Sequence, residues 1–92
     1  MAKQVSAAHI LVDTEKKASE IRERIYGGES FAEMAKKYSK CPSGRKGGDL
    51  GWFGRGQMVQ EFENAAFSNE KGAIVIVRTE FGWHLLLVKD TR

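Results

Sequence analysis

The chain has 92 residues, of which 41% are hydrophobic and 29% charged, an ordinary balance for one globular domain over residues 1–92. A chain of this size buries a single modest core, and its composition excludes disordered and fibrous proteins. Fifteen Lys and Arg face twelve Asp and Glu, and the charges are mixed along the chain, which indicates a solvated surface rather than a tail that binds polyanions.

The cysteine content and the apolar segments bear on location. Cys41 is the single cysteine, so no disulfide can form within the chain, and this favours a reducing compartment. The first residues contain no long apolar stretch, and no segment reaches the roughly 20 apolar residues that span a bilayer. We therefore expect a cytoplasmic protein without a membrane segment, and a monomer.

The first predicted elements are a strand and two helices. The run 8–12 is apolar with a β-branched bias, which predicts a strand. Thr14 then precedes apolar residues at helical spacing and can cap a helix that Gly27–Gly28 ends, with glycine free to adopt the left-handed conformation. Ser30, with Glu33 three positions later, has the capping-box pattern that begins a second helix.

Residues 39–56 are the unusual stretch, because six of the ten glycines and the only proline lie there. We expect a long loop, broken by a very short strand at 50–53, and loops of this length are usually functional. Beyond it the pattern predicts a short helix over 61–67 and two strands, 73–77 and 83–88, joined by a tight turn as a hairpin. The last strand is apolar on both faces and should be central. The order of elements predicts an α+β fold.

His9 and His84 are the only histidines, and each lies in a predicted apolar strand near one end of the sequence. If those strands are neighbours, the two imidazoles meet in the interior. A buried histidine is most often a core residue with satisfied hydrogen bonds, and that interpretation stays open. The two histidines and Cys41 lack the ligand number and spacing of a structural zinc site, so we expect no metal. Cys41 with a histidine could form a nucleophilic pair, but no third residue stands out to orient it.

Three segments of the sequence carry a family resemblance. The first is His9–Val12, which reads HILV. The second is GGDLGWF at 47–53, followed by GQM at 56–58 and FENAAF at 62–67. The third is TEFGWH at 79–84. In this order and at this spacing they resemble the parvulin family of peptidyl-prolyl cis/trans isomerases, and the resemblance covers almost the whole chain.

The resemblance implies a fold, a function and a set of site residues. The fold is a four-stranded antiparallel sheet surrounded by three to four helices, with the active site beside the long loop. His9 and His84 match the central histidine pair, Thr79 matches the hydroxyl in its hydrogen-bond network, and Cys41 matches a position held by Cys or Asp. The residues that match the proline pocket and its rim are Leu50, Gln57, Met58, Phe62 and Phe81.

By the same resemblance, the chain accelerates rotation about Xaa-Pro bonds without a covalent intermediate, without a cofactor and without a metal. Its partners would be proline-containing peptides and unfolded protein segments, and its role would be to assist protein folding. Two other functions stay open. One is a peptide-binding chaperone module with little turnover. The other is a weak nucleic-acid-binding domain, which the lack of an aromatic platform among the basic residues disfavours.

The chain departs from the family pattern in three places. The segment 13–17 is short and carries the acidic residues Asp13 and Glu15 where phosphate-directed members have a basic loop, so we expect no requirement for a phosphorylated residue before the proline. Residues 59–61 lack a common proline, and residues 73–78 lack the usual Gly-Pro. The last two departures concern the start of the third helix and the register of the hairpin, and they do not touch the pocket residues.

Overall fold

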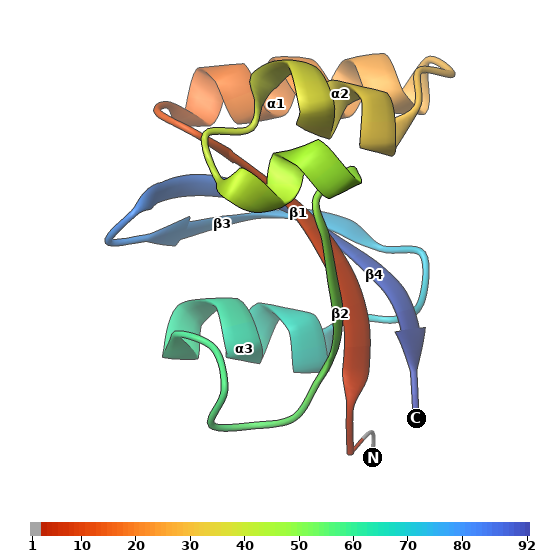
Figure 1. The fold of residues 1–92 in the computed structure, drawn as a ribbon, viewed down its shortest axis with the longest axis vertical. Helices are drawn as coiled ribbons and strands as arrows, with labels where there is room; N and C mark the ends of the chain where they lie inside the picture. The colour runs from red at the N-terminus through yellow and green to blue at the C-terminus, as the bar shows by residue number, and fades with distance from the viewer. Residues whose placement is uncertain (1–2) are drawn as a thin grey trace.

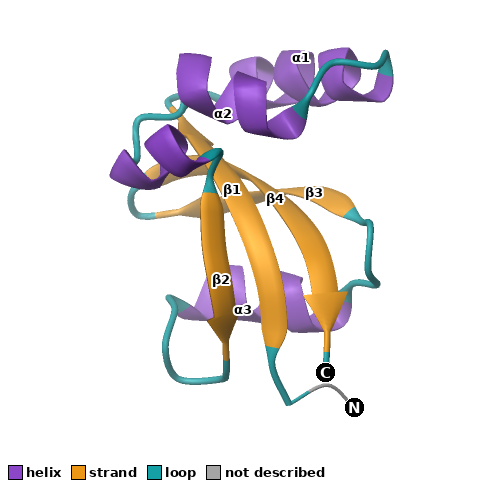
Figure 2. Cartoon of the chain, turned by 45° about the vertical axis from the view of Figure 1, so that its right-hand side comes forward, coloured by secondary structure: helices purple, strands orange, loops and turns teal. Residues whose placement is uncertain are grey.

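Four antiparallel strands form the centre of the structure, in the spatial order β2-β1-β4-β3 (Figures 1 and 2). The computed structural model describes residues 3–92. The strands are β1 (Val5–Val12), β2 (Asp49–Phe53), β3 (Ile74–Thr79) and β4 (Gly82–Thr91). The helices are α1 (Glu15–Tyr26), α2 (Phe31–Tyr38) and α3 (Gln60–Ser68), with a 3-10 helix, η1 (Pro42–Lys46). The expected α+β fold with a four-stranded antiparallel sheet is confirmed, and β4 is a central strand.

The two faces of the sheet carry separate apolar cores, because side chains alternate along each strand. One core lies under α1 and α2, and Figure 1 shows these two helices together on one side of the sheet. Its buried members are Ile10, Val12, Ala18, Ile21, Met34, Ala35 and Leu85. The other core lies under α3, on the opposite side. Its buried members are Val5, Ala7, Phe53, Phe62, Ala66, Val77, Leu86 and Val88.

The alternation also assigns the two histidines to a face. His9 continues the series that begins with Val5 and Ala7, and His84 begins the series that continues with Leu86 and Val88. Both imidazoles therefore point toward the side of the sheet that α3 covers. The strands extend beyond their predicted bounds because buried residues continue this alternation, and the first strand accordingly starts at Val5.

The glycine-rich stretch contains one element that the sequence did not indicate. Instead of a continuous loop, η1 runs from Pro42 to Lys46, with Pro42 at a position where its missing N–H costs nothing. The 3-10 helix ends at Gly47 in the left-handed conformation, with φ of 74°. At the end of α1, the left-handed residue is Gly28, with φ of 115°, whereas Gly27 remains in the right-handed region.

The two departures from the family pattern near the pocket leave regular structure in place. α3 begins at Gln60 after Val59, which offers no side-chain cap, and Glu61 and Glu63 lie in the first turn, where negative charge suits the helix dipole. The hairpin closes with Thr79 opposite Gly82. None of the helices in residues 3–92 is long and apolar enough to cross a membrane.

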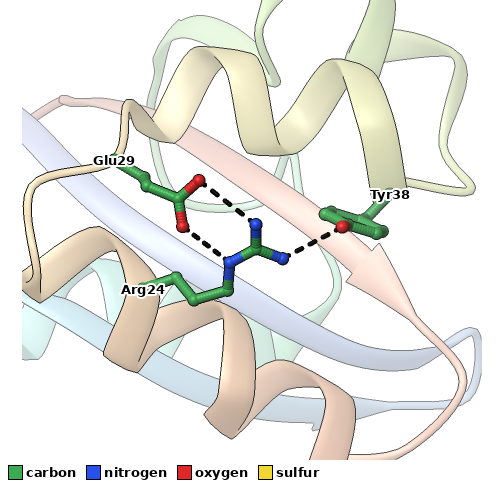
Figure 3. Close-up of polar contacts among 3 residues, drawn as sticks. All are labelled: Arg24, Glu29 and Tyr38. Atoms are coloured by element: carbon green, nitrogen blue, oxygen red, sulfur yellow. Dashed lines mark hydrogen bonds and ion pairs between the residues drawn. The ribbon is translucent and has the colours of Figure 1, made fainter.

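Arg24 ties α1 to the segments that follow it (Figure 3). Its Nε and one terminal nitrogen donate to the Glu29 carboxylate at 2.6 and 3.2 Å, and the other terminal nitrogen donates to the Tyr38 hydroxyl at 3.0 Å. Lys17 approaches the face of the same Tyr38 ring at 4.4 Å. These contacts fix the last turn of α2, from which the chain enters the glycine-rich stretch.

Candidate active site

His9 and His84 lie in contact across two neighbouring strands. β1 and β4 pair with Leu11 opposite His84, so that His9 is the diagonal neighbour of His84 on the same face. The two rings stack with centroids 5.1 Å apart, and their Nδ1 atoms are 2.9 Å apart. The prediction that the two imidazoles meet in the interior is confirmed. Since a hydrogen bond needs one donor, only one of the two Nδ1 atoms carries the shared proton.

A chain of hydrogen bonds uses every ring nitrogen of this pair. His9 Nε2 lies 3.0 Å from Ser43 Oγ, and His84 Nε2 lies 2.7 Å from Thr79 Oγ1. Thr79 Oγ1 also accepts a hydrogen bond from the backbone N–H of Phe81 at 3.1 Å. Both rings are therefore held in one orientation, and neither has a free nitrogen that would exchange a proton with a bound molecule.

Burial keeps both imidazoles neutral at pH 7. Burial, and to a smaller extent the neighbouring His84, lowers the pKa of His9 from 6.5 to about 4. Burial also lowers the pKa of His84. A charged ring at this depth would lose its hydration, and two charged rings would aim two N–H donors at one another. The pair is thus a rigid, uncharged platform.

An apolar pocket of about 480 Å³ lies directly beside the histidine pair. Its walls come from β1, β2, β4, α3, the start of η1 and the connecting segments. The residues that form them are His9, Leu11, Lys40, Cys41, Pro42, Leu50, Gln57, Met58, Val59, Phe62, Phe81 and His84. Phe62 meets both imidazoles edge-on, with ring centroids 5.6 Å from His9 and 5.5 Å from His84. Such a pocket has the size and lining to bind a small apolar ring of a peptide, with the rest of the peptide extending outside the pocket on either side.

The structure brings together all nine residues that the sequence singled out. Eight of them line the pocket, and the ninth, Thr79, supports it through its hydrogen bond to His84. Phe81 is 63% exposed and therefore forms part of the rim. The amide oxygen of Gln57 accepts a hydrogen bond from the backbone N–H of Gly54 at 2.8 Å, so this side chain also holds the loop beside the rim. Phe53 lies in the core beneath α3.

The arrangement of Cys41 does not resemble a nucleophilic pair. The Nε2 atom of His9 is hydrogen-bonded to Ser43, which lies two residues after Cys41 in the sequence, and the Nδ1 atom of His9 is hydrogen-bonded to His84. Neither nitrogen of that ring is therefore available as a base for the thiol. Among residues 3–92, no group of three or more His, Cys, Asp and Glu side chains lies close enough to hold a metal ion.

Sequence reasoning missed five residues of the site. Ser43 was missed because it lies in the glycine-rich stretch. The sequence there has no helical or strand periodicity from which the buried side chains could be predicted. The others are pocket-lining residues that flank the expected ones, namely Leu11, Lys40, Pro42 and Val59. The pattern of β1 places Leu11 on the same face as His9, so this residue could have been found from the two-residue period.

Gly48 holds the glycine-rich stretch against β1. Its carbonyl accepts a hydrogen bond from the backbone N–H of His9 at 2.9 Å. Gly48 has φ of 81°, and a Cβ atom there would lie only 2.3 Å from the His9 carbonyl oxygen. Only glycine permits this approach, which brings Ser43 and Cys41 to the histidine pair.

Residues 1–92 match the family model of the PPIC-type PPIase domain. The chain belongs to this family of peptidyl-prolyl isomerase domains. The resemblance to the parvulins is thereby confirmed, and with it the isomerase class of the domain.

Two solved structures and one curated relative illustrate the similarity of this PPIC-type domain. The foldase protein PrsA of Geobacillus sp. (strain WCH70) is 48% identical over 89 residues, which are 95% of this chain and 32% of the relative. PrsA of Bacillus anthracis superposes with a TM-score of 0.94 at 39% identity, covering 99% of this chain and 43% of that chain. The parvulin of Nitrosopumilus maritimus superposes with a TM-score of 0.88 at 35% identity, covering 97% of this chain and 98% of that chain. The chain therefore spans about a third of the curated foldase and nearly all of the Nitrosopumilus maritimus parvulin.

Proposed function

We propose that the protein accelerates cis/trans isomerisation of Xaa-Pro bonds in proline-containing peptides and unfolded protein segments, by holding the proline ring in the pocket while the preceding amide rotates. The observation that carries the proposal is the apolar pocket beside a neutral, fully hydrogen-bonded pair of imidazoles. Membership of the PPIC-type PPIase family supports the same activity.

The chemical task is to lower a rotational barrier. The barrier is about 18–20 kcal/mol because the C–N bond has partial double-bond character. The cis and trans ground states differ by only about 0.5–1 kcal/mol, so the problem is kinetic. No bond has to break, and the protein need only bind the twisted amide more tightly than the planar one. Tighter binding by about 5.5 kcal/mol would accelerate rotation roughly ten-thousand-fold.

The apolar walls of the pocket favour the twisted amide over the planar amide. A planar amide is polar through resonance, and a twisted amide has lost part of that charge separation. An apolar environment therefore disfavours the planar state more than the twisted one. Leu50, Met58 and Phe62 would grip the ring, and the thioether of Met58 adapts to the shape of the pyrrolidine. With the ring held, the residues before it rotate against a fixed partner.

The histidine pair would act by position rather than by proton transfer. Its ring nitrogens are engaged with one another, with Ser43 and with Thr79, and its neutral state keeps charge out of the pocket floor. Cys41 would shape the surroundings of the rotating carbonyl without attacking it, because no imidazole nitrogen is free to accept its proton.

The curated relatives are longer than this chain, so the proposal concerns the activity of this domain and does not include functions of the other parts of those proteins. The foldase relative suggests that the domain assists folding by acting on unfolded segments. We further propose that this chain is monomeric and cytoplasmic. The single cysteine supports a reducing compartment. Sedimentation velocity and a fluorescent fusion would test these two properties.

The activity is tested with a short Ala-Ala-Pro-Phe peptide, in which protease-coupled or NMR-detected rates of isomerisation are measured with and without the protein. Acceleration that saturates with peptide supports the proposal. A peptide-binding module with little turnover would instead give chemical-shift changes at the pocket residues without faster exchange, and that result would overturn it.

A further inference from the structure

A second hollow adjoins the pocket on the other side of a shared wall. It has a volume of about 350 Å³ and is lined by residues of α2, η1 and the segment between them. Three cationic side chains, Lys36, Lys40 and Arg45, contribute to its walls, and we call it the basic groove. The wall common to the pocket and the basic groove is the tripeptide Lys40–Pro42.

This wall is held firmly in place. Ser39 Oγ accepts hydrogen bonds from the backbone N–H groups of Leu11 and Cys41 at 3.1 and 3.3 Å, and the Lys40 N–H donates to the Leu11 carbonyl at 2.8 Å. On the far side of the groove, a Cβ atom at Gly44 would lie 2.9 Å from the Ala35 carbonyl oxygen, so η1 packs directly on α2. The basic groove therefore keeps a fixed position relative to the pocket.

The charge of the basic groove is positive and only partly compensated. Residues 34–48 contain five Lys and Arg and no Asp or Glu. Lys36 has a partner in Glu33 at 3.6 Å, and Lys40 pairs with Asp13. Both pairs are solvent-exposed and therefore weak. Arg45 takes part in none of the ion pairs found within residues 3–92.

We propose that the basic groove binds a carboxylate side chain of the substrate, so that the protein prefers Asp or Glu close to the proline that it isomerises. This inference rests on the proposed isomerase function. A segment that leaves the pocket across Lys40–Pro42 brings its next side chain over the groove. Because the proline pocket and the groove share that wall, one chain supplies both the ring and the carboxylate.

The size and lining of the groove favour a side chain over a larger polyanion. None of the residues that line it is aromatic, so it offers no stacking surface for nucleic-acid bases. Lys36 and Arg45 are also exposed, and exposed charge pairs give modest gains. The expected preference for an acidic over a neutral residue is therefore about 1.5-fold to fivefold in kcat/KM, and it should shrink as salt screens the charges.

The test measures kcat/KM by NMR exchange for peptides that carry Glu, Ala or Lys at each of the positions flanking the proline, at low and high salt. For the wild type we expect the order Glu, Ala, Lys at one position, with the Glu-to-Ala ratio falling toward 1 at high salt. In Lys36→Glu/Arg45→Glu that ratio should fall to 1 or below. The matched control Lys16→Glu, on the exposed first turn of α1, should keep the wild-type ratio.

The outcomes separate this inference from the function on which it rests. A wild-type protein that accelerates the Ala peptide and shows a Glu-to-Ala ratio of 1 at every position overturns the inference alone. A ratio above 1 that the double variant keeps also overturns it, because the carboxylate then binds elsewhere. If no peptide is accelerated, the proposed function and the inference fail together. The single variant Arg45→Glu provides the same comparison if circular dichroism shows that the double variant does not fold.

Discussion

Mild acid should destabilise this protein through His9, before most carboxylates are protonated. Burial lowers the pKa of His9 from 6.5 to about 4, so the folded protein excludes a proton that the unfolded chain binds. Above pH 6.5 the ring is neutral in both states and there is no penalty. Between pH 6.5 and 4 the unfolded state gains the proton and stability falls, and below pH 4 the loss from this group levels off.

The size of the loss follows from the difference in pKa. One pKa unit corresponds to about 1.4 kcal/mol, so His9 costs about 2 kcal/mol by pH 5 and about 3 kcal/mol by pH 4. The lowered pKa of His84 acts in the same direction. The free energy of unfolding of such a domain is typically about 5–15 kcal/mol, so the loss caused by His9 is a large part of the total stability.

The assay is urea unfolding from pH 7.5 to pH 4.5, followed by tryptophan fluorescence, with the free energy of unfolding extracted at each pH. His9→Gln, which cannot titrate at this position, is the control and should lack most of the decrease between pH 6.5 and pH 5. NMR titration of the ring protons supplies a direct check. Equal stability of the wild type at pH 6.5 and pH 5, or a His9 ring that titrates near 6.5 in the folded protein, would refute the reasoning.

Three further predictions concern the pocket and its support. Met58→Ala should lower kcat/KM at least tenfold with little loss of stability, because this side chain is only half-buried at the pocket; unchanged turnover would argue against the ring-binding role. Cys41→Asp should retain turnover within about threefold, since a non-covalent mechanism needs no thiol, and inactivity of a folded variant would contradict this. Gly48→Ala should destabilise the fold by more than about 3 kcal/mol, because the added Cβ atom would meet the His9 carbonyl. Gly72 also has a positive φ but has open space around it, so Gly72→Ala should cost only about 1 kcal/mol of backbone strain. Equal losses of stability for the two variants in chemical denaturation would contradict the contact between Gly48 and His9.

The strands, and the face on which each histidine lies, could be predicted from the sequence because side chains alternate between the two faces of a strand with a period of two residues. His9 and His84 each interrupt an apolar strand, and a two-residue period fixes the face of each ring once the strands are neighbours. The pattern did not determine the register of β1 against β4. That register decides whether the rings are diagonal neighbours or far apart, and only the resemblance to the parvulins implied the contact.

The glycine-rich stretch resisted prediction for a physical reason. Its course is set by close backbone contacts with distant segments, such as Gly48 against His9 and Gly44 against Ala35, and not by any local pattern. The 3-10 helix η1 and the hydrogen bond from Ser43 to His9 are consequences of those contacts. The family pattern pointed to Cys41, and the residue bonded to His9 lies two positions later.

Phe62 illustrates how one residue can serve two roles. It lines the pocket against both imidazoles, and it is also 3% exposed in the core beneath α3. Truncation to alanine would therefore cost about 3–5 kcal/mol of stability as well as the pocket wall. Loss of turnover in that variant would not separate binding from folding, which makes Met58 the better position at which to test the pocket.

The most direct test of isomerisation by ring binding in this pocket is an NMR exchange measurement of the cis/trans rate of one Ala-Pro peptide at equilibrium. Wild-type protein should produce fast exchange, Tyr26→Ala should match it because Tyr26 is an exposed residue of α1 remote from the pocket, and Met58→Ala should be slower by at least tenfold. Equal exchange rates for a folded Met58→Ala variant and the wild type would contradict the account, as would a wild-type rate no faster than that of the free peptide.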